Sequence, residues 1–201
     1  MAIAKKRKKF FDVEIPLIRK ETQAIAYTLE GLDGRHVSYD LTRILRGKGI
    51  LLQAKIKVEN DQAIASPTKI HLMPFFLKRM VRKGTNYVED SFSTETKDAQ
   101  VRIKPFLVTR RKVSRAVRKA LREKAREELI KYLKTKKLEE VFQDILKNIL
   151  QKTLSLKLKK VYPLSSCEIK SLRLEKELEP VKKETKKEVK KTLKKVEEKK
   201  E

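Results

Sequence analysis

The chain of 201 residues has one cysteine, two histidines, five glycines and no tryptophan. A single cysteine, Cys167, excludes an internal disulfide framework and suits a reducing compartment. Because Ile169 and Leu172 follow it with apolar spacing, Cys167 is expected to be a small strand or core residue rather than a reactive thiol. His36 and His71 have no partners at metal-ligand spacing, so we expect structural roles for both and no metal site.

Glycine is too scarce for the loops that bind nucleotide phosphates. Neither a Gly-x-Gly-x-x-Gly sequence nor a Walker loop is present. The Gly47-Lys-Gly49 segment could cradle a phosphate, but a plain turn is the favoured interpretation. Paired acids such as Glu139 and Glu140 lie on a charged helix face and are expected to be solvated. We therefore expect no catalytic residue, no cofactor and no enzymatic activity.

Long apolar runs are also absent. No stretch approaches the roughly 18 consecutive apolar residues that a membrane-spanning helix requires. The basic N-terminus is followed by Phe10, Phe11, Asp12 and Glu14, where a signal peptide has its apolar segment. These features predict a soluble protein of the cytoplasm.

Acidic residues are few relative to basic ones. The chain has 27 Asp and Glu against 52 Lys and Arg, a formal net charge of +25. Like charges repel one another in a compact chain, so this surplus indicates an external polyanion. Nucleic acid fits best, because each phosphate that is neutralised releases condensed counterions. On charge alone, an anionic membrane surface is the alternative partner.

Composition divides the chain into three parts. Residues 12–178 have the apolar patterning of a folded domain, whereas residues 179–201 repeat Lys and Glu with sparse apolar positions and are expected to be disordered. Four of the 25 surplus charges belong to this tail, so the binding charge lies mainly in the folded part and in the first segment. That segment, residues 1–11, is a basic arm with Lys5, Lys6, Arg7, Lys8 and Lys9.

The first half of the folded part is rich in β-formers. The segments before and after the Gly31–Gly34 turn are expected to pair as a hairpin, and a later hairpin is expected around residues 96–98. Pro74 is expected to begin a short helix. About six short strands with tight turns predict a small β-barrel or sandwich. The expected strands are residues 22–30, 35–39, 50–58, 67–72, 85–94 and 100–108.

The second half is helical. Apolar residues recur every three or four positions from Val113 to Leu133, which predicts a long amphipathic helix. The same pattern returns from Leu138 to Leu150, with a further helical piece over residues 153–160. A final strand over residues 166–174 would return to the sheet. The predicted fold class is α+β, a small β-barrel core flanked by helices, with a basic N-terminal arm and a charged C-terminal tail.

Eight basic residues and no acid lie between Val101 and Lys119, across the end of a strand and the start of the long helix. The N-terminus of a helix carries partial positive charge and prefers acids, so cations there cost stability unless an anion is bound. Phosphates would satisfy both the side chains and the free backbone N–H groups. We therefore predict RNA binding by these residues and by the arm. The eight are Arg102, Lys104, Arg110, Arg111, Lys112, Arg115, Arg118 and Lys119.

Two aromatic residues adjoin the arm. Phe10 and Phe11 are candidates for base stacking, because aromatic faces beside a basic segment can hold unpaired bases. The other aromatic residues are expected to belong to the core.

Several short segments, taken in order along the chain, form a recognisable pattern. The segments are Phe10-Phe-Asp-Val13 with Pro16, Asp40-Leu41, Thr94-Glu-Thr-Lys-Asp98, Thr109-Arg-Arg-Lys-Val113, Leu138-Glu-Glu-Val141 and Val161-Tyr-Pro-Leu164. In their order and spacing they resemble the S-three-A (S3Ae) family of small-subunit ribosomal proteins of archaea and eukaryotes. The resemblance covers roughly residues 1–178, and the Lys/Glu tail departs from it.

The resemblance implies a β-barrel core with flanking helices and a structural, non-catalytic role in the small subunit. It implies binding to small-subunit rRNA on the platform near the messenger exit, beside neighbouring ribosomal proteins and messenger RNA. The alternative that we weigh is a duplex-DNA architectural protein of the chromatin type. That alternative predicts similar affinity for duplex DNA and folded RNA.

Overall fold

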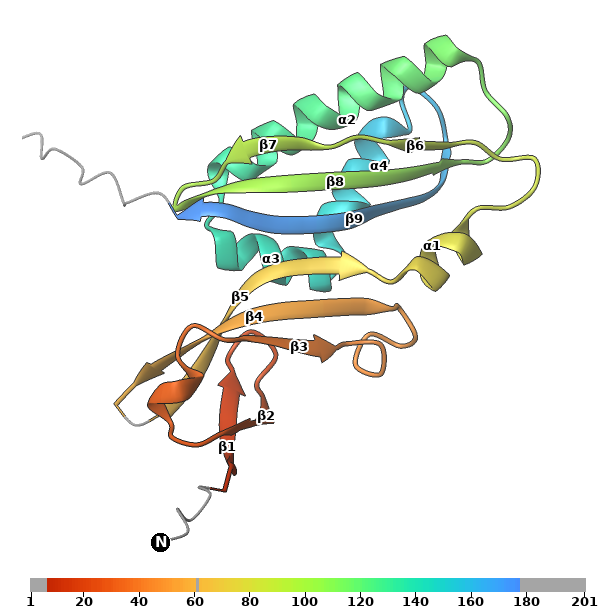
Figure 1. The fold of residues 1–201 in the computed structure, drawn as a ribbon. Coiled ribbons are helices and arrows are strands. Elements are labelled where there is room, and N and C mark those ends of the chain that lie inside the picture. The colour runs from red at the N-terminus through yellow and green to blue at the C-terminus, as the bar shows by residue number, and fades with distance from the viewer. Residues whose placement is uncertain (1–6, 61, 178–201) are drawn as a thin grey trace, which may run out of the picture.

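The computed structural model describes residues 7–60 and 62–177, which form an α+β fold around a nine-stranded sheet (Figure 1). Lys5, Lys6 and the tail from residue 179 lie outside the described residues. The strands are β1 (Lys9–Ile15), β2 (Lys20–Ala26), β3 (His36–Asp40), β4 (Ile50–Glu59), β5 (Gln62–Leu72), β6 (Tyr87–Glu89), β7 (Phe92–Glu95), β8 (Ala99–Thr109) and β9 (Leu164–Glu177). The helices are α1 (Pro74–Met80), α2 (Arg115–Thr135), α3 (Leu138–Leu146) and α4 (Ile149–Leu158), with a 3-10 turn at Glu30–Leu32.

The last strand joins the two parts of the sheet. The hydrogen-bonded order is β2-β1-β5-β9-β8-β6, with β4 beside β5, β3 beside β4, and β7 beside β8. Strand β9 pairs antiparallel with β8 from Thr109 back to Ala99, and with β5 at residues 69–71. The parallel pair is β1 with β5, at Val13 and Glu14. The predicted final strand that returns to the sheet is therefore confirmed.

The α+β class is confirmed, but the sheet of the described residues is open and does not close into a barrel. A closed barrel requires the two edge strands of the sheet to pair with each other. Here β2 pairs with β1, and β3 pairs with β4, so these two strands do not join. The predicted hairpin across Gly31 and Gly34 is therefore wrong. Leu32, in the turn between the two strands, is 1 % exposed, and its burial in the core separates β2 from β3.

The true partner of β2 is a strand that the sequence analysis did not predict. Strand β1 begins at Lys9, inside the segment expected to be a free arm. It buries Val13 and Ile15, and its outward positions remain exposed. Lys9, Phe10 and Phe11 therefore belong to the sheet, which corrects the predicted end of the arm at residue 11.

Helices α2, α3 and α4 lie against one face of the sheet, and the other face is left uncovered along residues 99–104 of β8 and the part of β9 that pairs with them (Figure 1). The alternation of side chains along β8 fits this arrangement, because Val101 and Ile103 are buried and Arg102 and Lys104 are exposed. The long amphipathic helix is confirmed as α2, which buries Leu121, Ala125, Leu129 and Leu133. None of the helices in residues 7–60 and 62–177 has the length and apolarity needed to cross a membrane.

The second predicted helix is divided in two. Helix α3 ends at Leu146 and α4 begins at Ile149, because Asn148 between them has a left-handed backbone with a φ of 60°. Asparagine adopts this conformation more readily than most residues. The further helical piece predicted over residues 153–160 is the second half of α4.

The Gly47–Gly49 segment forms a turn that directs its lysine inward. Lys48 is 9 % exposed, and its Nζ lies 2.6 Å from Glu168 Oε2 in β9 and 2.5 Å from Asn148 Oδ1 between α3 and α4. The ion pair thus connects the β3–β4 loop to the last strand and the helical layer. Gly49 is close-packed, since an added Cβ would lie 2.7 Å from Phe75 Cζ.

We expect Lys48→Met to lower the free energy of unfolding by about 3 kcal/mol, because it leaves the Glu168 carboxylate without its partner in a largely buried site. The matched control is Lys170→Met, which removes an exposed partner of Glu89 at 3.0 Å and should cost about 1 kcal/mol or less. Urea denaturation of both variants measures the difference. Equal losses would contradict a special role for the Lys48–Glu168 pair.

Cys167 lies in β9 with 8 % of its surface exposed, as predicted for a strand residue of the core. Burial raises the pKa of its thiol to about 12, and the neighbouring Glu168 carboxylate acts in the same direction. Only the thiolate reacts readily, and at neutral pH this site favours the neutral thiol.

We expect Cys167 in the folded chain to resist an aromatic disulfide reagent at pH 8, and to react fully once the chain is unfolded in urea. The absorbance of the released thiolate measures both reactions. Fast modification of the native chain would show that β9 opens readily.

Candidate nucleic-acid interface

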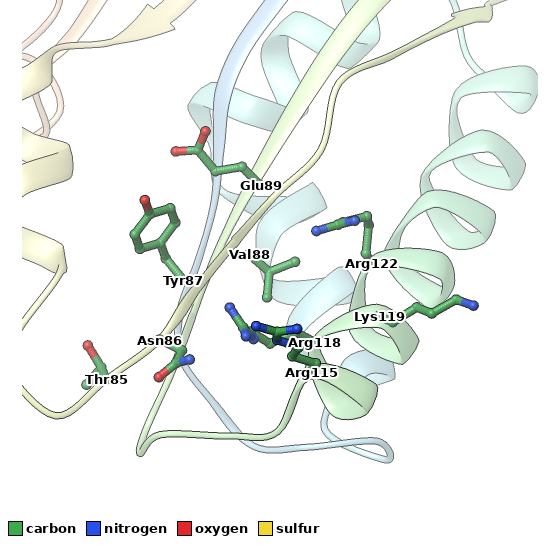
Figure 2. A pocket seen from close by; sticks show the side chains of 9 residues that line it. All are labelled: Thr85, Asn86, Tyr87, Val88, Glu89, Arg115, Arg118, Lys119 and Arg122. Atoms are coloured by element: carbon green, nitrogen blue, oxygen red, sulfur yellow. The ribbon is translucent and has the colours of Figure 1, made fainter.

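A groove of about 760 Å³ lies between the first turns of α2 and strand β6 at the end of the sheet (Figure 2). Strand β6 has one edge paired with β8, and α2 passes along its other side. Val88 forms the floor and is 3 % exposed. The residues that line the groove are Thr85, Asn86, Tyr87, Val88, Glu89, Arg115, Arg118, Lys119 and Arg122.

Three arginines of α2 extend into this groove. Figure 2 shows Arg115, Arg118 and Arg122 reaching from the helix toward β6, whereas Lys119 points away from the strand. Positions 115, 118 and 122 lie on one helix face, because they are separated by three and four residues. None of these three arginines forms an ion pair with another residue of the described ranges.

The one acid of the lining is turned away. Glu89 alternates with Val88 along β6 and points to the opposite side of the strand (Figure 2). Both of its carboxylate oxygens accept hydrogen bonds from Lys170 Nζ, at 3.1 and 3.0 Å. The groove therefore presents positive charge without an internal counter-charge.

Arg118 is the least exposed of these cations. Its Nε is buried and has no hydrogen-bond partner among the described residues. A buried donor without a partner costs free energy, and native structures nearly always satisfy such groups. An anion in the groove would supply the missing acceptor.

The helix N-terminus adds to the positive field. Ser114 caps α2, and its Oγ accepts a hydrogen bond from the Val117 N–H at 3.4 Å. The first turn contains no acid, so nothing in it offsets the partial positive charge of the helix end. The free N–H groups of that turn are further donors for an anion.

Buried Thr109 fixes the position of the groove relative to the sheet. Its side-chain oxygen accepts from the Asn86 N–H at 3.0 Å and donates to the Arg111 carbonyl at 2.7 Å. Its own N–H donates to the Asn86 carbonyl at 2.8 Å. These bonds tie the segment before β6 to the chain that leaves β8 and enters α2.

The structure separates the eight basic residues of the Val101–Lys119 run. Arg115, Arg118 and Lys119 line the groove, whereas Arg102 and Lys104 are exposed on β8. Arg102 is partly neutralised, since its Nε lies 2.7 Å from Glu175 Oε1.

The remaining three members of the run lie in a connecting loop. Arg110, Arg111 and Lys112 are exposed between β8 and α2, and the helix begins at Arg115, two residues after the predicted start of the apolar pattern at Val113. They precede the groove in the chain but do not line it. The sequence run is therefore not a single patch.

The arm residues have different environments. Arg7 and Lys8 are exposed before β1, and Lys8 Nζ lies 5.6 Å from the centre of the Tyr27 ring. Lys9 is the first residue of β1. Phe10 is 67 % exposed and available for stacking, whereas Phe11 packs against the core on the other face of the strand. Of the two predicted stacking residues, Phe10 alone is placed to meet a base.

Sequence reasoning missed Arg122. The predicted basic run ends at Lys119, because the uncharged Ala120 and Leu121 separate Arg122 from it. Extending the helical spacing by one turn from Arg118 would have identified Arg122, because residues four apart share a helix face.

The described residues contain no group of three His, Cys, Asp or Glu side chains that could hold a metal ion. The hydrogen-bond donors that the groove offers to a ligand are arginine side chains and the backbone N–H groups of the first turn of α2. This donor set is suited to the oxygens of phosphates, which guanidinium groups bind in a forked geometry.

Comparison with known proteins agrees with this chemistry. The small ribosomal subunit protein eS1 of Nanoarchaeum equitans is 29% identical over 181 residues, covering 85% of this chain and 90% of that protein. The eS1 protein of Pyrobaculum arsenaticum is 26% identical over 140 residues, covering 69% of this chain and 64% of that protein. The comparisons give no support to a chromatin-type DNA protein. Because residues 4–177 match the Ribosomal S3Ae family, the chain belongs to that family.

Proposed function

We propose that the chain is a structural constituent of the small ribosomal subunit that binds rRNA through the phosphates of its backbone. The observation that carries this proposal is the groove in which Arg115, Arg118 and Arg122 converge without a counter-charge. Family membership supplies the ribosomal context, since the relatives are small-subunit proteins. In this role the chain supports translation in the cytoplasm and performs no catalysis.

The groove is suited to recognising RNA by shape. Contacts to phosphates fix the position and orientation of a protein on a nucleic acid but carry no direct sequence information. Double-stranded RNA is recognised mostly through its shape and backbone. A groove with fixed walls, held by Thr109 and Asn86, presents its arginines at set positions against such a backbone.

Further parts of the basic surface extend the contact. Arg110, Arg111 and Lys112 would follow the backbone beyond the groove, and the arm residues Lys5 to Lys9 would add contacts at the other end of the chain. Phe10 would stack on an unpaired base. We place the protein on the platform near the messenger exit, beside neighbouring ribosomal proteins and the exiting messenger RNA, on the strength of the family resemblance.

The triple substitution Arg115→Gln, Arg118→Gln and Arg122→Gln should weaken rRNA binding about tenfold or more at moderate salt, because charge-assisted hydrogen bonds are lost. The slope of log K against log salt should fall by about 2 to 3, about one for each phosphate contact removed. Filter binding across a salt series measures both quantities. The midpoint temperature of thermal unfolding should be unchanged or slightly higher, because the repulsion among the three arginines is removed.

The matched control neutralises three exposed lysines outside the groove, Lys131, Lys134 and Lys152. Its net charge equals that of the groove variant. An equal loss of affinity in both variants would mean that total charge, and not the groove, determines binding.

In a native lysate of its own organism, the chain should sediment with small ribosomal subunits and remain with them at moderate salt. Ribonuclease should release it, because rRNA holds it there. Immunoblotting of gradient fractions measures this distribution. Migration with chromatin, or equal affinity for duplex DNA and rRNA in competition, would overturn the ribosomal assignment.

A further inference from the structure

The face of the sheet that the helices leave uncovered carries a second group of cations. Ile70, Leu172 and Ile103 are in register across β5, β9 and β8, and all three are buried. Their sequence neighbours Lys69, Arg173 and Arg102 are in register as well and project to the opposite face. The alternation that builds the core therefore aligns three cations across three adjacent strands.

Two of these cations, Lys69 and Arg173, border a shallow hollow of about 540 Å³. Its lining residues are His36, Gln53, Lys55, Thr68, Lys69, Arg173, Leu174 and Glu175. Glu175 is the single acid of the lining, and its Oε1 is engaged by Arg102 Nε at 2.7 Å. Lys55, Lys69 and Arg173 have no ion pair within the ranges that the structure describes.

The three cations aligned across β5, β9 and β8 lower the stability of the free protein. Lys69 lies opposite Arg173, and Arg173 lies opposite Arg102. Like charges directly opposite one another on adjacent strands are destabilising, because their side chains are neighbours on one face. A bound anion would reverse this repulsion.

A half-buried histidine lies near Lys69 on β5. His71 follows Lys69 by two residues on β5 and lies opposite Ser171 of β9. The pKa of His71 is lowered, first by burial and then by the charge of Lys69.

We propose that the open face at Lys55, Lys69 and Arg173, with His36 at its margin, is a second binding site for an RNA phosphate backbone, so that the chain bridges two RNA segments. The first segment occupies the groove beside α2, and the second crosses β4, β5 and β9 on the other side of the sheet. This inference rests on the proposed function, because it assigns a second contact to the same ligand class.

The chemistry of the hollow favours RNA over a protein partner. Stable protein interfaces have an apolar core surrounded by a polar rim. Here the lining is polar apart from Leu174 and the alkyl parts of the long side chains. A row of cations across adjacent strands suits the phosphates of an RNA backbone better than the apolar core of a protein partner.

The two sites lie on different sides of the fold. The groove is at the β6 edge, next to a helix of the covered face, whereas the hollow is centred on β5 and β9 of the open face. Strand β8 intervenes between β6 and β9. Because the two sites face different sides of the sheet, we expect their simultaneous occupancy to require two segments.

A bridging assay tests the proposal with two short RNA duplexes of identical sequence, one carrying a donor and the other an acceptor fluorophore. The full-length chain at equimolar concentration should bring them together and produce energy transfer. The open-face variant Lys55→Gln, Lys69→Gln and Arg173→Gln should abolish the transfer while still binding one duplex. The groove variant, with Arg115, Arg118 and Arg122 changed to Gln, should behave in the same way.

The control is the Lys131, Lys134 and Lys152 glutamine variant, which should retain full energy transfer. Circular dichroism and thermal unfolding establish that every variant is folded, and sedimentation establishes that the free chain is monomeric. Transfer that persists in the open-face variant would overturn the proposal, because other parts of the chain would then suffice for bridging.

The outcomes separate this inference from the proposed function. If the unmodified chain binds no RNA at all, the proposed function fails. If the chain binds RNA and the open-face variant bridges as well as the unmodified chain, the function stands and the second site does not. If the open-face variant bridges the duplexes normally but is no longer incorporated into ribosomal particles, the open face binds a protein partner, and the RNA assignment is overturned.

Discussion

The pairing of β9 with both β8 and β5 is the constraint on which the rest of the described structure depends. The first five strands and the β6–β8 group are hydrogen-bonded to each other only through this strand. Ile103 and Leu172, paired across β8 and β9, are fully buried with the helical layer. Because β9 comes after the other elements of the described residues, the sheet is completed by contacts between residues far apart in the chain. Such non-local pairing is expected to make folding slow relative to that of a helical bundle.

The same pairing determines where positive charge gathers. Side chains alternate between the two faces of a strand, so in residues 101–104 of β8 and 172–173 of β9 the buried side chains alternate with cations on the uncovered face. Helix α2 then carries a further set of cations to the β6 edge, where Thr109 and Asn86 hold the chain in place. The two cationic surfaces are therefore products of one sheet with one covered face.

Several acids of the folded part connect elements. Glu168 pairs with Lys48 between β9 and the β3–β4 loop, and Glu128 pairs with Lys157 between α2 and α4. Asp144 of α3 accepts hydrogen bonds from Tyr132 Oη and Lys136 Nζ at the end of α2. Hydrogen bonding to Asp144, and then to Tyr132, raises the pKa of Lys136. The cations of the groove and of the open face are left without acids, which reserves them for an external anion.

The sequence by itself determined the fold class, the amphipathic helix α2, the returning strand β9 and the demand for a polyanion. These features depend on local periodicity and on total charge, which are present in the order of the residues. Only the tertiary structure decided that β2 pairs with β1 and not with β3, because the hydrogen-bonding edges of strands are alike and do not specify their partners. It also decided that the basic run is divided between two faces, and that Arg122 joins the groove. The grouping of Lys55, Lys69 and Arg173 was likewise beyond the sequence, because strand register brings together residues that lie more than a hundred positions apart.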